Sequence, residues 1–210
     1  TTGFREDLTA AREKGLLDFV RGGGALVGVH SAACSFGASR AYVELLNGEF
    51  QTHPRLQEIP VRITDRDHYL TVRMPDFTIE DELYMLRRHD PAKSRVLAEA
   101  SWQGRSLPLL FVHPYGQGRV AYLALGHDLR AWLHPEFQKL LLRCIEWTSG
   151  AELAKREIRC GLLGYGPTCN MGRVHSANIN AQRGMRTVAV CDTDPARRAA
   201  AEEELHGVRT

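Results

Sequence analysis

The stretch GGGALVGVHSA, residues 22–32, decides the fold class of the first part of the chain. Its apolar run at 25–30 follows residues 5–21, whose apolar side chains approximate a helical stripe that the glycines end. A helix that leads into a short apolar run is typical of a buried parallel strand. In open α/β sheets, ligands bind at the carboxyl ends of such strands. The stretch therefore predicts an α/β domain with His30 at a ligand-binding edge.

The residues around His30 resemble a nucleophile elbow, the G-x-nucleophile-x-G turn that projects one side chain between a strand and a helix. Here Gly28 is the first glycine, His30 is the centre and Ala32 replaces the final glycine. Ser31 and Cys34 are the nearby side chains that could act as nucleophiles.

The following residues predict further elements of an α/β domain. SRAYVELLNGEF, residues 39–50, has the pattern of a helix closed by Asn47-Gly48, and the segment around 59–65 alternates like a strand. Residues 94–125 predict three strands separated by glycine turns. HPEFQKLLLRCIEWTSG, residues 134–150, is the clearest helix, with Pro135 in its first turn.

Four polar residues follow predicted elements and are the candidate catalytic groups: His30, His53, Glu82 and His127. Several histidines and a carboxylate at one site serve either as acid and base groups or as ligands for a divalent metal. The residues leave both roles open, and we assign no metal ligand from them. The remaining histidines of the first domain are weaker candidates: we place His68 below the four, and expect His89, His113 and His134 to be structural or on the surface.

Composition excludes some classes of protein. The 210 residues have a net charge of +2, from 27 basic and 25 acidic side chains without a basic block, so we expect no nucleic-acid partner. No apolar run has the length of a membrane span, so we expect no membrane partner. Five cysteines without a C-x-x-C pair predict free thiols in a reducing compartment and a cytoplasmic location. The sequence leaves a homo-oligomeric assembly open.

The polar stretch around 149–159 predicts a domain boundary. We therefore divide the chain into a first domain at 1–150, a linker at 151–157 and a second segment at 158–210. The second segment predicts a strand, a glycine turn, a helix, the strand RTVAVCD and the start of another helix. This order is a partial Rossmann β-α-β unit.

The glycine turn of the second segment predicts a dinucleotide site. In a G-x-G turn, the first glycine permits the tight bend and the second lets the backbone approach the pyrophosphate at a helix N-terminus. Cys169 stands where the third glycine is expected, and we predict that Gly172 replaces it after a longer turn. An acidic residue at the end of the second strand would bind the ribose, and it favours NAD over NADP because a carboxylate repels a 2′-phosphate. The predicted NAD(P)-binding residues are Gly164, Tyr165, Gly166, Asn170, Met171, Gly172 and Asp192.

Two resemblances extend these predictions. Five ordered blocks, GGGALVGVHSA, YVELLNGEFQTHP, DFTIEDELYML, YGQGRVAYLALGHD and HPEFQKLLLRCIEWTSG, resemble the ThuA-like (trehalose utilisation) domain over about residues 4–150. That resemblance implies a fold like that of class I glutamine amidotransferases, and a role with a small sugar such as trehalose or a 3-keto glycoside. It also implies that the family's opening strands precede residue 4, so we expect the chain to be cut there. His30 stands in place of the amidotransferase nucleophile, which argues against glutaminase activity.

Residues 156–210 resemble the nucleotide-binding start of the Gfo/Idh/MocA oxidoreductases, whose catalytic Lys lies further along than this chain extends. Together the resemblances imply a fragment of a carbohydrate-modifying fusion protein with an NAD(P)-dependent sugar oxidoreductase. Two alternatives remain: an amidotransferase-like hydrolase that uses Ser31 or Cys34, and a non-catalytic carbohydrate-binding module.

Overall fold

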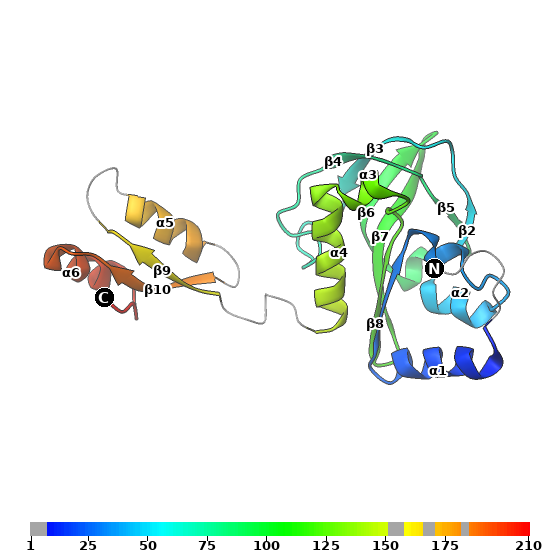
Figure 1. The fold of residues 1–210 in the computed structure, drawn as a ribbon, viewed down its shortest axis with the longest axis horizontal. Coiled ribbons are helices and arrows are strands. Elements are labelled where there is room, and N and C mark those ends of the chain that lie inside the picture. The colour runs from blue at the N-terminus through cyan, green and yellow to red at the C-terminus, as the bar shows by residue number, and fades with distance from the viewer. Residues whose placement is uncertain (1–7, 151–157, 166–170, 182–184) are drawn as a thin grey trace. The chain divides into compact units, whose positions relative to one another are not determined.

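The computed structural model describes residues 8–150, 158–165, 171–181 and 185–210. The chain divides into two compact units, unit 1 from Thr1 to Ala151 and unit 2 from Glu152 to Thr210. Each unit is described by itself (Figure 1). In the described part of the chain, no helix has the length and apolar character needed to cross a membrane.

Unit 1 is built on a six-stranded mixed sheet with the order β1-β8-β7-β6-β3-β4. Strand β1 is parallel to β8, and the other neighbours are antiparallel. The predicted parallel strand is thus confirmed, within a sheet of which most pairs are antiparallel. The strands are β1 (Ala25–Val29), β3 (Gln57–Ile63), β4 (Phe77–Asp81), β6 (Arg95–Trp102), β7 (Arg105–Tyr115) and β8 (Gly118–Leu123).

The sheet curls at β3. Only Arg62 and Ile63 of this strand pair with β6, whereas residues 57–61 pair with β4. In a flat sheet, the five strand spacings between β1 and β4 would amount to roughly 24 Å. The curl brings the end of β4 back toward the end of β1, and this return positions the candidate site.

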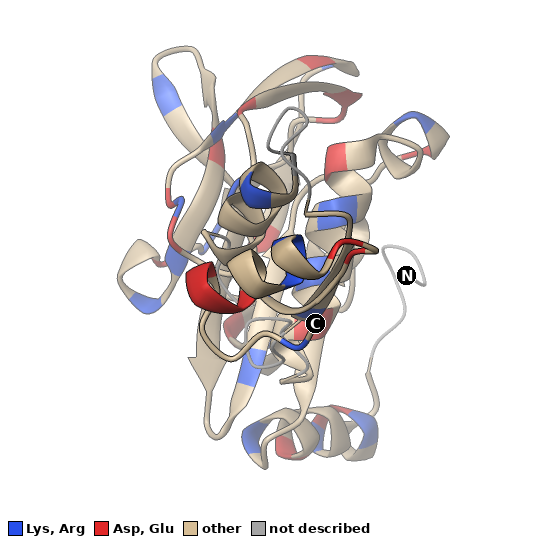
Figure 2. Ribbon diagram, turned by 90° about the vertical axis from the view of Figure 1, so that its left-hand side faces the viewer, with Lys and Arg blue, Asp and Glu red and all other residues tan. Residues whose placement is uncertain are grey.

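Helices lie on both sides of the central strands. Figure 1 shows α4 (Pro135–Thr148) on one side of β7 and β8, and α1 (Ala10–Arg21) and α2 (Arg40–Leu46) on the other. Short helices complete the unit: η1 (His30–Cys34), η2 (Pro91–Lys93) and α3 (Leu129–Trp132). The core between the layers is apolar and includes Phe111, Tyr122 and Phe137, which are fully buried. On α1, acidic and basic side chains are interspersed (Figure 2), with ion pairs from Asp18 to Lys14 and Arg21.

One predicted helix boundary needs correction and another is confirmed. The helix predicted at 5–21 begins at Ala10, where Thr9 caps it by accepting a hydrogen bond from the Arg12 N–H. The closure predicted at Asn47-Gly48 is confirmed: α2 ends at Leu46, and Asn47 caps it in a left-handed conformation with a φ of 58°. The residues after Gly48 form β2 (Glu49–Thr52), which pairs with β5 (Met85–Arg87). The three strands predicted within 94–125 and the helix at 134–150 are confirmed as β6, β7, β8 and α4.

Unit 2 contains two parallel strands, β9 (Ile158–Leu163) and β10 (Met185–Cys191), with α5 (Met171–Asn180) between them in sequence. A further helix, α6 (Pro195–Glu204), follows β10. The core of this unit is small and centres on Tyr165, Val190 and Ala201. The elements follow the predicted order, and the assignment of a Rossmann unit to them stays a prediction.

Candidate functional site

His30 occupies a strained position at the end of β1. It is buried, and its φ of 43° lies in the left-handed region that residues other than glycine rarely adopt. The buried Tyr122 hydroxyl donates a hydrogen bond to the His30 carbonyl oxygen at 2.9 Å. The ring of Tyr84 packs against the imidazole with 3.8 Å between ring centroids. The turn therefore projects His30 as a nucleophile elbow projects its central residue.

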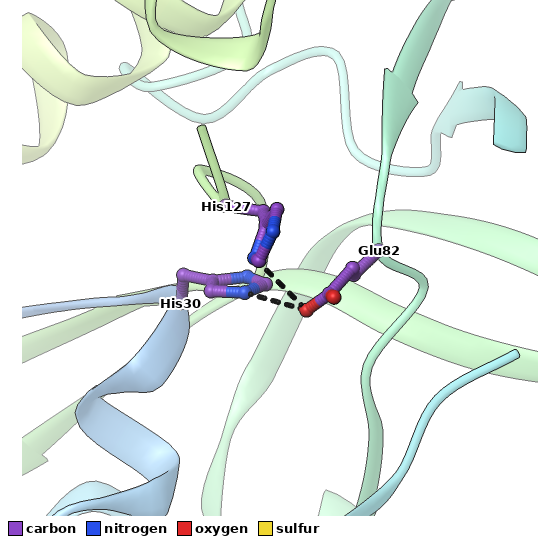
Figure 3. Close-up of side chains that lie close together, drawn as sticks. All are labelled: His30, Glu82 and His127. Carbon is purple, nitrogen blue, oxygen red and sulfur yellow. Dashed lines mark hydrogen bonds and ion pairs between the residues drawn. The ribbon is translucent and has the colours of Figure 1, made fainter. Parts of the chain in front are cut away.

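All four predicted catalytic residues come together around the Glu82 carboxylate. Figure 3 shows His30 and His127 pointing at Glu82; their Nε2 and Nδ1 atoms lie 3.3 Å and 3.0 Å from Glu82 Oε2. His53 Nε2 lies 3.7 Å from the other oxygen, Oε1. His30 and His127 meet because the parallel strands β1 and β8 end at the same edge, while the curl of the sheet brings in Glu82. We call these four residues the histidine cluster.

The hydrogen-bond partners of two histidines fix which ring nitrogen has the hydrogen. His30 Nδ1 lies 2.7 Å from the Ala124 carbonyl oxygen, and His53 Nδ1 lies 2.7 Å from the Pro54 carbonyl oxygen. Since a carbonyl oxygen only accepts, Nδ1 is the donor in both rings. In the neutral rings, the unprotonated Nε2 atoms then face the carboxylate of Glu82.

Burial lowers the pKa of His30, although the Ala124 carbonyl and the carboxylates of Asp81 and Glu82 oppose that shift. The neutral imidazole is therefore the favoured form in the folded protein. A neutral His30 presents the lone pair of its Nε2 atom to the Glu82 carboxylate. These two acceptors can share an acidic proton or a cation that lies between them.

Asp81 is a positioning residue that the sequence analysis missed. Its buried carboxylate accepts hydrogen bonds from the backbone N–H of Gly126 at 2.6 Å, Glu82 at 2.8 Å and His127 at 3.1 Å. It thereby links the end of β4 to the loop after β8 and holds two residues of the cluster. The sequence contains a hint of this role, because Asp81 falls in the same alternating register as the apolar Ile79.

The neighbourhood of Cys34 does not favour a thiolate nucleophile. Burial raises the pKa of the Cys34 thiol, which donates a hydrogen bond to the Tyr84 hydroxyl over 3.5 Å. A reactive cysteine requires the opposite shift. Cys34 therefore contacts Tyr84, which packs against His30, and lies beside the histidine cluster.

The weaker histidine candidates lie outside the cluster. His134 caps α4, accepting from the Glu136 N–H at 3.2 Å and contacting the Thr78 carbonyl at 3.0 Å. His89 packs on Phe111 and contacts the Ser94 hydroxyl at 3.1 Å. Both are structural, as predicted. The Leu70 N–H donates to His68 Nδ1 at 3.2 Å, in the loop before β4.

The glycine turn of unit 2 is described in part. Gly164 has a φ of 90°, and an added Cβ at Gly172 would lie 2.8 Å from the Gly164 carbonyl oxygen. The third glycine of such a turn allows close packing of the helix on the strand, and this approach at Gly172 fits the predicted replacement. Gly166 and Asn170 lie outside the described residues, and Met171 is the first residue of α5.

The Asp192 carboxylate accepts hydrogen bonds from backbone N–H groups of unit 2. It accepts hydrogen bonds from the N–H of Tyr165 at 2.7 Å and of Asp194 at 3.0 Å, and these bonds lower the pKa of Asp192. In the predicted role, the same oxygens would accept from ribose hydroxyls.

The curled mixed sheet, with a histidine cluster where β1 and β8 end, defines unit 1 as an α/β domain with a polar site at its strand ends. The family model described as trehalose utilisation (ThuA) matches residues 1–148, and the chain belongs to this family.

Solved structures show the same fold. A ThuA-like protein from Parabacteroides merdae is 23% identical, with a TM-score of 0.64 over 70% of this chain and 68% of that one. A ThuA-like protein from Bacteroides uniformis is 20% identical, with a TM-score of 0.59 over 70% of this chain and 66% of that one. A cytoplasmic protein from Salmonella typhimurium is 13% identical, with a TM-score of 0.51 over 68% and 62% of the two chains. Among curated proteins, none matches the chain significantly.

Proposed function

We propose that unit 1 binds a small carbohydrate of the trehalose or keto-glycoside class at the histidine cluster and converts it. One observation supports this most strongly: three histidines from separate segments converge on a single carboxylate, in a family described by trehalose utilisation. Polar groups that converge at strand ends are typical of active sites.

The exposure of the cluster suggests how the work is divided. The side chains of His127 and His53 are 41% and 34% exposed, whereas those of Glu82 and His30 are 14% and 6% exposed. A sugar would therefore contact His127 and His53 first. Glu82 and His30 would orient these groups from below, and proton transfer at the cluster would serve the conversion.

Calorimetric titration with trehalose and with an oxidised glycoside tests this proposal. We expect binding by the wild-type chain, and loss of both binding and turnover in His127→Gln. His206→Gln is the control, because His206 is an exposed histidine of unit 2. If neither sugar binds, the proposal fails. If the wild type and the variants all bind sugar and none of them converts it, the chain is a carbohydrate-binding module. Labelling by an electrophilic probe that Ser31→Ala or Cys34→Ala abolishes would instead favour the hydrolase.

We further propose that residues 158–210 begin an NAD(P)-dependent sugar oxidoreductase of the Gfo/Idh/MocA type, with NAD favoured. The parallel pair β9 and β10, the close approach at Gly172 and the position of Asp192 after β10 support this. Such a partner domain would oxidise a sugar hydroxyl to a ketone while NAD is reduced to NADH, and unit 1 would receive the resulting keto compound. The test is NADH formation by the full-length protein with a panel of sugars; no reduction with any sugar would exclude the proposal.

A cytoplasmic location fits the free thiols of Cys34, Cys144, Cys160 and Cys191 and the name of the Salmonella relative. Fractionation of cells that express the tagged protein tests the location. Size-exclusion chromatography with light scattering decides whether the chain forms a homo-oligomer.

A further inference from the structure

We infer that His30, Glu82 and His127 form a binding site for one divalent transition-metal ion of the zinc class. The ligand atoms are His30 Nε2, Glu82 Oε2 and His127 Nδ1, which all lie within 4.8 Å of one another. The inference concerns the same cluster as the proposed sugar chemistry and names the cofactor that it would use, so it deepens that proposal.

The spacings from Glu82 Oε2 to both histidines fit a tetrahedral ion. Bonds of about 2.0–2.1 Å to zinc place neighbouring tetrahedral ligands about 3.3 Å apart. The two contacts to Glu82 Oε2 measure 3.3 Å from His30 and 3.0 Å from His127. All three ligand atoms lie within 4.8 Å of one another, so an ion between them would draw the two histidines toward itself.

The hydrogen placement at His30 is that of a metal ligand. Its Nδ1–H is held by the Ala124 carbonyl at 2.7 Å, which leaves Nε2 free to coordinate. Metal-bound histidines nearly always donate their other ring hydrogen to a carbonyl or carboxylate, which fixes the ring. Without a cation or a proton between them, the Nε2 lone pair and the Glu82 oxygen would face each other as two acceptors.

Buried side chains hold the backbone of all three ligands in place. Asp81 holds the N–H groups of both Glu82 and His127, the two ligands that follow β4 and β8 in the chain. The Tyr122 hydroxyl holds the carbonyl of His30. Each ligand is thus positioned by a buried group that does not itself coordinate, which is the usual construction of a protein metal site.

Three protein ligands leave a coordination position open. Catalytic zinc sites have this arrangement, whereas structural sites close all four positions with protein ligands. The exposed sides of His127 and His53 give solvent and substrate access to that position. An ion there supplies a polarised carbonyl or an activated water. His53, whose Nε2 is 3.7 Å from Glu82 Oε1, then stands beside the ion as a proton acceptor.

Metal titration of the chelator-treated chain tests the inference without any sugar. Co²⁺ should give a visible absorption band that saturates at one ion per chain, and Zn²⁺ should displace it. Glu82→Gln and His127→Gln should each weaken Zn²⁺ binding by about 100-fold or more, given the effects that supporting residues alone produce. The control His206→Gln should bind as the wild type does. Circular dichroism of each variant shows whether it is folded. His127→Gln should leave the core intact, because the His127 side chain lies at the solvent side of the cluster.

Either of two results would overturn the inference: no saturable Co²⁺ or Zn²⁺ binding by the wild type, or equal binding by the wild type and both folded cluster variants. The first result would mean that His30 and Glu82 share a proton instead of an ion. Metal binding without sugar turnover would leave the inference standing while the proposed function fails, so the two can be separated.

Discussion

The carbonyl of His30 depends on one buried hydroxyl, and its removal gives a prediction at the scale of a single residue. Tyr122→Phe deletes the hydrogen bond to that carbonyl, which is 2.9 Å long in a fully buried place. Leaving a buried acceptor unsatisfied costs about 1–3 kcal/mol. We expect urea unfolding to show a loss of that size, together with weaker metal binding because His30 is less well held.

Tyr115→Phe is the matched control for this measurement. The Tyr115 hydroxyl accepts a hydrogen bond from Arg21 at 3.2 Å, at the surface of the protein. Its loss should change the free energy of unfolding by less than about 0.5 kcal/mol. Equal effects of the two substitutions would show that the Tyr122 hydroxyl has no special part in holding His30.

At the scale of elements, Asp81 is the connection between β4 and the loop after β8. Asp81→Asn keeps the shape but turns one acceptor into a donor, which then faces either the N–H of Gly126 or that of His127. We expect a loss of about 2 kcal/mol in stability and a lower affinity at the cluster. Glu80→Gln is the control, since Glu80 is an exposed neighbour on the same strand, paired at the surface with Arg130. Retention of full stability and binding in Asp81→Asn would contradict the positioning role.

The contact of α5 with the turn after β9 gives a second prediction at this scale. Gly172→Ala would place a Cβ 2.8 Å from the Gly164 carbonyl oxygen and 2.8 Å from Tyr165 Cα, both backbone atoms that cannot yield easily. Overpacking of this kind costs about 1–3 kcal/mol. Gly161→Ala is the control, because a Cβ there meets no described atom within 4 Å. Hydrogen exchange of β9 and β10 amides should speed up in the first variant and not in the second.

The elements also show what the sequence could and could not predict. His30 and His127 could be predicted as site residues from their positions after apolar strands, β1 and β8, whereas the parallel pairing that brings them together is known only from the structure. The approach of Glu82 could not be derived in this way. It depends on the curl of the sheet at β3, where only Arg62 and Ile63 pair with β6. Likewise, the positioning roles of Asp81 and Tyr122 could not be predicted. Asp81 bonds to Gly126, 45 residues away in sequence, and Tyr122 bonds to His30, 92 residues away, and no local pattern encodes such contacts.

At the scale of the whole molecule, acid should affect unit 2 through Asp192. Its folded-state pKa is lowered, chiefly by the hydrogen bonds from the Tyr165 and Asp194 N–H groups. A lowered folded-state pKa stabilises the fold above the unfolded pKa of about 3.9, and the stabilisation is lost as the pH falls through the folded value. Asp192→Asn should therefore destabilise unit 2 near neutral pH and converge with the wild type in stronger acid. Parallel stability curves at every pH would contradict this.

The two units should also unfold separately, and the positions of the tryptophans make this measurable. Trp102, Trp132 and Trp147 all belong to unit 1, so tryptophan fluorescence follows that unit alone. Circular dichroism follows the helices of both units. Unit 2 has about 60 residues and a small core, a size at which a fold is only marginally stable. In urea, we expect the dichroism signal to begin to fall before the fluorescence changes. Gly172→Ala should move only that early step, whereas Tyr122→Phe should move only the later one. A single transition that coincides for both probes would show that the units unfold together.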